Sequence, residues 1–350
     1  MRIAQVSPLH EAVPPKLYGG TERVVSYLTE ELVAMGHEVT LFASGDSVTS
    51  ARLVSPWPRA LRLDPGVRDV NAPHALMMEM LMQRADEFDV MHCHLDYHPF
   101  SVLSRQATPF VTTLHGRLDL PELRPVYKMF LDVPVVSISD SQRLPLPEAG
   151  WIQTVPHGLP ENLLTPRAVA PEYLAFLGRI APEKRPDIAI RIARACGIPL
   201  KLAAKVDRVD VEYHERVVQP LLGAGAAELI GEINDEQKSD FLSGATALLM
   251  PLDWEEPFGL VMIEAMACGT PVIAFNRGSV PEIIEDGVTG FIVDNEASAI
   301  AAVGQRHTLD RNRIRRRFEA RFTARRMAED YVEVYRRLAL SRKTTLRAIG

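Results

Sequence analysis

Cysteine is scarce in this chain of 350 residues, with only Cys93, Cys196 and Cys268, and the three lie far apart. An odd number of isolated thiols is typical of reduced cysteines in a cytoplasm and not of a disulfide framework. No apolar run reaches the roughly 18 residues of a membrane-spanning helix, and the first residues do not have the pattern of a secretory signal. We therefore expect a cytoplasmic protein.

The sequence also lacks a basic excess and a dinucleotide fingerprint. The formal net charge is −6 and the pI is near 6.0, so nothing draws the whole chain to nucleic acid, and we predict no nucleic-acid partner. The G-x-G-x-x-G pattern of nicotinamide enzymes, with a ribose-binding acid about 20 residues later, is not found. This argues against a nicotinamide dehydrogenase.

What is present is a repeated alternation of short apolar runs with helical patterns. The chain is long for one hydrophobic core, and the alternation pauses once, in the proline-rich stretch VPHGLPENLLTPRAVAPEY. Such alternation predicts parallel, doubly wound α/β sheets. We predict two Rossmann-like β/α/β domains that face a central cleft, at residues 1–156 and 173–325, with a linker at 157–172 and a helical segment at 326–350.

The C-terminal stretch combines arginines with an apolar stripe at helical spacing. One interpretation is a solvated amphipathic helix packed on the domains. The other is a basic surface for peripheral contact with an anionic membrane or for an acidic acceptor. The arginines are Arg311, Arg313, Arg315, Arg316, Arg317, Arg321, Arg325 and Arg326, and the stripe is Met327, Tyr331, Val334, Tyr335 and Leu338.

Ligands of open parallel sheets bind beyond the carboxyl ends of the strands. Gly19 and Gly20 follow the first predicted strand, where backbone N–H groups can approach an anion, although an ordinary glycine turn explains them as well. Arg179 and Lys184 flank a loop that opens a helix, and two cations there suit a pyrophosphate, although ordinary surface charges fit equally. Lys205 follows another strand end, where a phosphate or base-pocket contact and a plain surface lysine fit equally.

Histidines gather after two predicted strands. His115 lies near the end of FVTTLHG, and His92 and His94 share one strand face in DVMHCHLDYHPF. With Cys93 and Asp96 nearby a metal site is conceivable. The spacing matches no zinc pattern, however, and a wall of the cleft or a hydrogen-bonded core explains these histidines as well. We predict no metal.

An acidic residue interrupts the most apolar run of the chain, GLVMIEAMACG. A helix that is apolar all round is buried, so Glu264 needs hydrogen-bond donors. A ribose diol offers two hydroxyls, and an internal arginine is the alternative. Eight positions earlier, Glu256 precedes Pro257, Phe258 and Gly259, and the N–H groups of Phe258 and Gly259 point out from the helix start. These are the pieces of a nucleotide-sugar site, in which the donors to Glu264 come from a ligand.

Taken in order, these motifs resemble the retaining nucleotide-sugar glycosyltransferases of the GT-B fold, family 4, also called glycosyl transferases group 1. Glu256 and Glu264, with seven residues between them, resemble the double-glutamate motif of that family. The stretches GGTERVVSYLTEELVAMGHEVTLFA, DVMHCH, TLHG, GRIAPEK and GSVPEIIEDGVTGFIV resemble further family motifs, so the likeness covers nearly all of residues 1–335. The linker departs from the family because PHGLP, at residues 156–160, lacks the usual aspartate.

The resemblance implies a hexosyltransferase that uses a nucleoside-diphosphate sugar, retains the anomeric configuration and needs no metal or other cofactor. UDP-glucose and GDP-mannose are the donors it favours, and the acceptor is a glycan, a lipid-linked molecule or a small molecule. The first domain would bind the acceptor, the second would bind the nucleotide sugar, and the C-terminal helix would return to the first domain.

The resemblance also assigns roles to the motif residues. Glu264 would bind the ribose hydroxyls, and Glu256 would contact the donor sugar. Arg179 and Lys184 would hold the pyrophosphate as it leaves, and His115 would line the reaction centre. No enzymic nucleophile is required, because the chemistry is charge stabilisation and positioning. The other donor-binding candidates are Gly19, Gly20, Lys205, Phe258, Gly259 and Leu260.

Two other functions fit the same fold. A nucleotide-sugar epimerase or a phosphorylase is the first, and the double-glutamate pattern argues against it. A non-catalytic, two-domain sugar-binding protein of the periplasm is the second. It would need an export signal, and it has no use for Arg179 beside Lys184.

Overall fold

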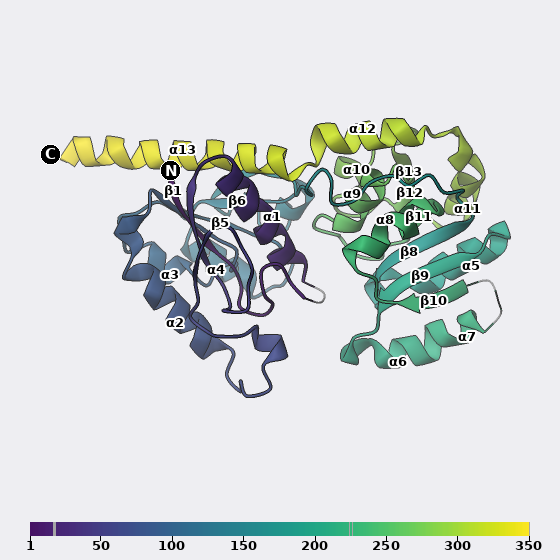
Figure 1. The fold of residues 1–350 in the computed structure, drawn as a ribbon, viewed down its shortest axis with the longest axis horizontal. Helices are drawn as coiled ribbons and strands as arrows, with labels where there is room; N and C mark the ends of the chain where they lie inside the picture. The colour runs from purple at the N-terminus through teal and green to yellow at the C-terminus, as the bar shows by residue number, and fades with distance from the viewer. Residues whose placement is uncertain (17–18, 224, 226, 350) are drawn as a thin grey trace. The chain divides into compact units, whose positions relative to one another are not determined.

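The computed structural model divides into two compact units (Figure 1). The N-terminal unit is Met1–Gly158 with Ala324–Gly350, and the C-terminal unit is Leu159–Thr323. The structure describes residues 1–16, 19–223, 225 and 227–349, with side chains as far as residue 340. Each unit contains one parallel sheet connected through helices. The predicted class of two Rossmann-like α/β domains is therefore confirmed.

The sheet of the N-terminal unit has seven parallel strands in the order β3-β2-β1-β4-β5-β6-β7. From β1, the strand order proceeds through β2 and β3 towards one edge of the sheet, and from β4 it proceeds towards the other edge. Ligands of such folds bind beyond the carboxyl ends of the strands where the order changes, here between β1 and β4. The strands are β1 (Arg2–Val6), β2 (Glu38–Phe42), β3 (Arg52–Val54), β4 (Val90–Cys93), β5 (Phe110–Thr113), β6 (Val135–Ser137) and β7 (Trp151–Thr154). The helices are α1 (Gly20–Ala34), α2 (Asn71–Met82), α3 (Phe100–Leu103), α4 (Leu123–Met129) and α13 (Ala324–Ile349).

The sheet of the C-terminal unit has six parallel strands in the order β10-β9-β8-β11-β12-β13. Its central strands are apolar and buried, as expected for a sheet covered on both faces. The strands are β8 (Tyr173–Arg179), β9 (Leu200–Lys205), β10 (Ala227–Gly231), β11 (Ala245–Met250), β12 (Val272–Phe275) and β13 (Gly290–Val293). The helices are α5 (Pro186–Cys196), α6 (Val211–Tyr213), α7 (Gln219–Leu222), α8 (Asp235–Ser243), α9 (Leu260–Ala267), α10 (Val280–Ile283), α11 (Glu296–Gln305) and α12 (Arg311–Arg321).

Helix α13 belongs to the N-terminal unit although it follows the C-terminal unit in the chain (Figure 1). The predicted apolar stripe faces inward, and both of its tyrosines are buried. The hydroxyl of Tyr335 lies 2.7 Å from His92 Nδ1, and that of Tyr331 lies 2.8 Å from Thr113 Oγ1. The helix is thus held by hydrogen bonds as well as apolar contact, and its predicted return to the first domain is confirmed.

The arginines of α12 mostly face the protein. Arg311 donates to the carbonyls of Ser243 and Ala245. Arg315 donates to the carbonyls of Leu164, Ala267 and Glu161. Ala267 is the last residue of α9, whose terminal carbonyls lack partners within the helix. These contacts favour the interpretation of a helix packed on the protein over that of a basic surface for a membrane. None of the described helices is long and apolar enough to cross a bilayer.

We predict that Arg315→Ala destabilises the protein by about 1–3 kcal/mol, because the carbonyls of Leu164 and Ala267 lose the donor of partly buried hydrogen bonds. Calorimetric unfolding should show this as a fall in Tm of roughly 2–4 °C for each kcal/mol. The matched control is Arg313→Ala on the same helix, where the side chain is exposed. Equal Tm values for the two variants would contradict the anchoring role of Arg315.

Acidification should destabilise the N-terminal unit through His92. Burial, followed by the nearby His115, holds the pKa of His92 well below the usual 6.5. As the pH falls below about 6.5, the unfolded chain binds a proton that the folded protein refuses, so stability falls by about 1.4 kcal/mol per pH unit for one such site. We expect His92→Gln to reduce the slope of unfolding free energy against pH between 6.5 and 5. The exposed His307→Gln should keep the wild-type slope.

Candidate functional site

Candidate residues of the C-terminal unit lie at the carboxyl edge of its sheet. β8 ends at Arg179 and β9 at Lys205, and these two residues are partners in the strand register. Lys184 lies in the 3-10 turn Pro182–Lys184 that follows β8. The loop after β11 carries Glu256 and leads into α9. Parallel strands thus bring together residues that are up to 77 positions apart, from 179 to 256, in the sequence.

Arg179 and Lys205 lie in a network of ion pairs. Arg179 contacts Glu183, and its guanidinium is 3.6 Å from Asp207 and 3.8 Å from Asp210. Lys205 Nζ is 3.0 Å from Asp207. Burial raises the pKa of Asp210; Arg179 opposes the rise, and Glu183 and Asp207 add to it. A diphosphate would therefore compete with carboxylates for these cations.

Lys184 and Glu256, two of the predicted catalytic residues, are in direct contact. Lys184 Nζ donates to Glu256 Oε2, and Trp254 Nε1 donates to the same oxygen at 3.1 Å. The Lys184 ammonium also lies 4.9 Å from the centroid of the Trp254 ring. One carboxylate oxygen thus accepts from an ammonium and from an indole, which fixes the Glu256 side chain.

A second loop holds the backbone around Glu256. Gly278, just after β12, has φ 55°, and a Cβ added there would lie 2.3 Å from the carbonyl oxygen of Glu256. The next residue, Ser279, donates its N–H to that carbonyl at 2.9 Å and its hydroxyl to the carbonyl of Phe258 at 2.7 Å. Glu255 accepts from the N–H of Gly278 at 2.6 Å. The close approach requires glycine at position 278.

Helix α9 begins where the sequence predicts it. Gly259 is its N-cap, with φ 81°, and a side chain there would collide with the Met262 side chain 2.8 Å away. The first N–H groups of a helix, here including that of Leu260, have no partner within the helix. This start therefore offers backbone donors of the kind that bind phosphate or sugar oxygens.

Glu264 is buried in α9 with 3% of its surface exposed. Its Oε1 accepts a hydrogen bond of 2.6 Å from Lys238 Nζ on α8, and Lys238 is also 3.3 Å from Asp235. Its Oε2 is shielded from solvent and has no hydrogen-bond partner in the part of the chain that the structure describes. The expectation that a ligand supplies the donors is therefore wrong for one oxygen, where the partner is an internal lysine and not the alternative arginine.

Sequence reasoning missed Lys238 and Trp254, which contact Glu264 and Glu256 in addition to the predicted Lys184. Lys238 carries a readable signal, because it shares a helix face with Phe241 and Leu242 at spacings of three and four, where an apolar side chain is expected. A lysine at such a position needs a buried anion. Trp254 carries no comparable signal, since its contact depends on the course of the loop after β11.

In the N-terminal unit, Gly19 is the N-cap of α1 and Gly20 its first residue, and residues 17 and 18 lie outside the described part. A Cβ at Gly19 would lie 2.9 Å from the Pro15 side chain, whereas one at Gly20 would meet open space. Buried Glu22 in the first turn has a raised pKa, chiefly because of burial. A carboxylate so close to this helix start makes it less favourable for an anion than the two glycines alone indicated.

His115 follows β5 and is half-buried beside the buried imidazoles of His94 and His157. Its Nε2 lies 2.8 Å from His94 Nδ1, and its ring stacks on that of His157 with centroids 5.2 Å apart. Burial lowers the pKa of His115 to about 3 and holds the pKa of His94 and His157 well below the usual value. All three rings are therefore neutral near pH 7.

The histidines of DVMHCH lie in a hydrogen-bonded core, which is one of the interpretations that the sequence left open. His92 Nε2 is 2.7 Å from Thr113 Oγ1, and His94 Nε2 is 3.0 Å from Gln5 Oε1. Burial raises the pKa of the Cys93 thiol. Within the described residues, no group of three or more His, Cys, Asp or Glu side chains could hold a metal ion.

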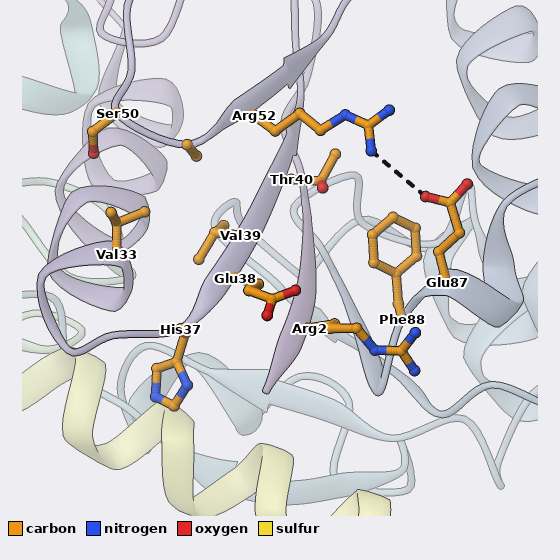
Figure 2. A pocket seen from close by; sticks show the side chains of 11 residues that line it. Arg2, Val33, His37, Glu38, Val39, Thr40, Ser50, Arg52, Glu87 and Phe88 are labelled. Atoms are coloured by element: carbon orange, nitrogen blue, oxygen red, sulfur yellow. Dashed lines mark ion pairs between the residues drawn. The ribbon is translucent and has the colours of Figure 1, made fainter.

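A hollow of about 510 Å³ lies away from these residues (Figure 2). Arg2, Glu38 and Arg52, which line it, begin β1, β2 and β3, so the hollow opens at the amino edge of the N-terminal sheet. Figure 2 shows Arg52 paired with Glu87, at 3.8 Å. The predicted site residues follow the opposite, carboxyl ends of strands, and none of them lines this hollow.

Comparison with known proteins gives two family matches. The model for glycosyl transferases group 1 matches residues 165–321. The model for glycosyltransferase family 4 matches residues 18–137. Each match falls within one of the two units.

Three similar proteins extend the comparison. A D-inositol 3-phosphate glycosyltransferase of Streptomyces scabiei is 32% identical over 41% of this chain, but the match spans only 33% of that relative. A phosphatidyl-myo-inositol mannosyltransferase of Mycolicibacterium smegmatis is 28% identical over 87% of this chain and 84% of its own length. The crystal structure of AviGT4, a glycosyltransferase involved in avilamycin A biosynthesis, superposes with a TM-score of 0.74 at 25% identity, over 97% of this chain and 98% of the other.

The two matches cover both Rossmann-like units, and the superposition extends over nearly the full chain. This chain belongs to family 4 of the glycosyltransferases, the group 1 enzymes of the GT-B fold.

Proposed function

We propose that this glycosyltransferase moves a hexosyl group from a nucleoside-diphosphate sugar to an acceptor, with retention of configuration and without a metal. The observation that carries the proposal is Oε2 of Glu264, which has no hydrogen-bond partner among the described residues. A buried carboxylate oxygen without a donor costs free energy, and a ribose hydroxyl supplies that donor. Since Lys238 occupies Oε1, the nucleotide gains one hydrogen bond to Glu264 without displacing the internal ion pair.

The diphosphate would lie between the start of α9 and the cations at the sheet edge. Backbone N–H groups at Gly259 and Leu260 would donate to it, as at other helix N-termini. Arg179 and Lys184 would stabilise the charge that develops as the diphosphate leaves. Both cations already contact carboxylates. Binding of the diphosphate would therefore exchange one set of anionic partners for another.

Glu256 and His115 would contact the sugar. The Glu256 carboxylate is fixed by Trp254 and Lys184, so it would accept from sugar hydroxyls without first being ordered. His115 is neutral and offers a ring nitrogen to a hydroxyl. The acceptor hydroxyl would itself attack the anomeric carbon, on the face from which the diphosphate leaves, and the departing diphosphate would take its proton. No enzymic nucleophile is then required.

UDP-glucose and GDP-mannose remain the donors that we favour. The relative from Mycolicibacterium smegmatis is named a mannosyltransferase, which supports a hexose donor. Both relatives carry an inositol compound in their names, so we propose a polyol acceptor that is free, phosphorylated or linked to a lipid.

The role of Glu264 can be separated from its role in folding. We predict that the double variant Lys238→Met/Glu264→Leu folds, because an apolar pair can replace a buried ion pair. It should bind nucleoside diphosphates about tenfold or more weakly than the wild type, because a charged acceptor is lost. Calorimetry with UDP, GDP and ADP measures this, and the exposed Glu228→Gln is the control. Undiminished binding by the double variant would remove Glu264 from the site.

Glu256→Gln should lower kcat by about 10- to 100-fold, the range expected when a hydrogen bond to a charged group is lost. The affinity for the nucleoside diphosphate should change far less, because the proposed contact is to the sugar. The neighbouring Glu255→Gln is the matched control, since its carboxylate faces the backbone of Gly278. A normal kcat in Glu256→Gln would contradict the role.

A further inference from the structure

A buried chain of polar side chains joins helix α13 to His115. Gln5 Nε2 donates to the hydroxyl of Tyr335 at 2.9 Å. The other end of the same amide, Gln5 Oε1, lies 3.0 Å from His94 Nε2. His94 Nδ1 in turn lies 2.8 Å from His115 Nε2. Gln5 and Tyr335 have no exposed surface, and His94 has 3%.

The hydrogen bonds in this series of side chains all run in one donor-to-acceptor direction, because the imidazoles are neutral. A neutral imidazole donates from one nitrogen and accepts at the other. Gln5 Oε1 can only accept, so His94 Nε2 carries the proton and His94 Nδ1 must accept. The donor to His94 Nδ1 is then His115 Nε2, which carries the proton of that ring. His115 Nδ1 is left with a lone pair.

The orientation of the Gln5 amide decides this direction. Its Nε2 lies 2.9 Å from the Tyr335 hydroxyl, which can accept or donate, and 3.5 Å from His92 Nδ1. The Tyr335 hydroxyl accepts from Gln5 Nε2 and donates to His92 Nδ1, 2.7 Å away. His92 Nε2 then donates to Thr113 Oγ1 at 2.7 Å. If the amide were reversed, its nitrogen would face His94, and the protons of His94 and His115 would both move to Nδ1.

The hydrogen-bonded series of side chains ends at His115 Nδ1. This atom is shielded from solvent and has no hydrogen-bond partner among the residues that the structure describes. An unpaired acceptor in such surroundings costs free energy, and a hydroxyl that donates to it recovers that cost. The same nitrogen with a proton could only donate, so the tautomer decides which substrate group fits.

We propose that Gln5 and Tyr335 are positioning residues that hold His115 in its Nε2–H tautomer, so that Nδ1 accepts a hydrogen bond from a hydroxyl of the sugar substrate. The sugar contact rests on the proposed function, whereas the control of the tautomer does not. Helix α13 thereby acts on His115 through two intervening side chains, those of Gln5 and His94.

The test compares Tyr335→Phe with Tyr331→Phe. Both remove one buried hydroxyl from the same helix, but Tyr335 contacts the Gln5 amide directly, whereas Tyr331 bonds to Thr113 at the far end of the same network. Nitrogen-15 spectra of the histidines in the full chain report which ring nitrogen carries the proton, and His115→Gln assigns the signals. We expect an unprotonated Nδ1 in wild type and Tyr331→Phe, and a shift toward protonated Nδ1 in Tyr335→Phe. Gln5→Met gives a second route to the same shift.

Kinetics add a separate readout. With the donor found by calorimetry, Tyr335→Phe should lower kcat by about fivefold to tenfold, the value of one hydrogen bond, and leave nucleoside diphosphate affinity unchanged. A wild-type His115 with the proton on Nδ1, or identical tautomers in Tyr335→Phe, Gln5→Met and wild type, would overturn the proposal. If the tautomer shifts as expected but no nucleotide sugar is turned over by the wild type, the proposed function fails and the control of the tautomer stands.

Discussion

The candidate residues around Glu264 and those around His115 depend on one constraint, which is the exclusion of water from the ends of the sheets. A polar side chain that folding removes from water must find its partner inside the protein. Lys238 therefore lies against Glu264, and Gln5 lies between His94 and Tyr335. In each case one acceptor is left without a partner, and in both cases it belongs to a residue that the sequence had already marked.

The elements and their order could be predicted because they depend on local pattern. Buried parallel strands are continuous apolar runs, and the glycine at 259 and the apolar run after it define α9. The paired glutamates were identifiable from Glu264, because a carboxylate in the apolar stretch GLVMIEAMACG costs free energy unless it accepts a hydrogen bond. The double-glutamate spacing and the loop motifs then carried the family resemblance.

The partners of the site residues could not be predicted to the same degree, because they come from distant parts of the chain. Lys238 precedes Glu264 by 26 positions, and Tyr335 follows Gln5 by 330. The arginines of α12 illustrate the same limit. Their sequence pattern fits a solvated or membrane-facing surface, yet Arg311 and Arg315 donate to carbonyls of the protein, and only the fold decides between these outcomes.

The place of α13 in the chain has a consequence for protein synthesis. The C-terminal unit is one continuous segment, so the ribosome delivers all of it before it delivers α13. The N-terminal sheet emerges first, but the hydroxyls that pair with Gln5, His92 and Thr113 come last. The unit that is translated first can therefore complete its hydrogen bonds only after the following unit has been translated, and that following unit can fold in the meantime.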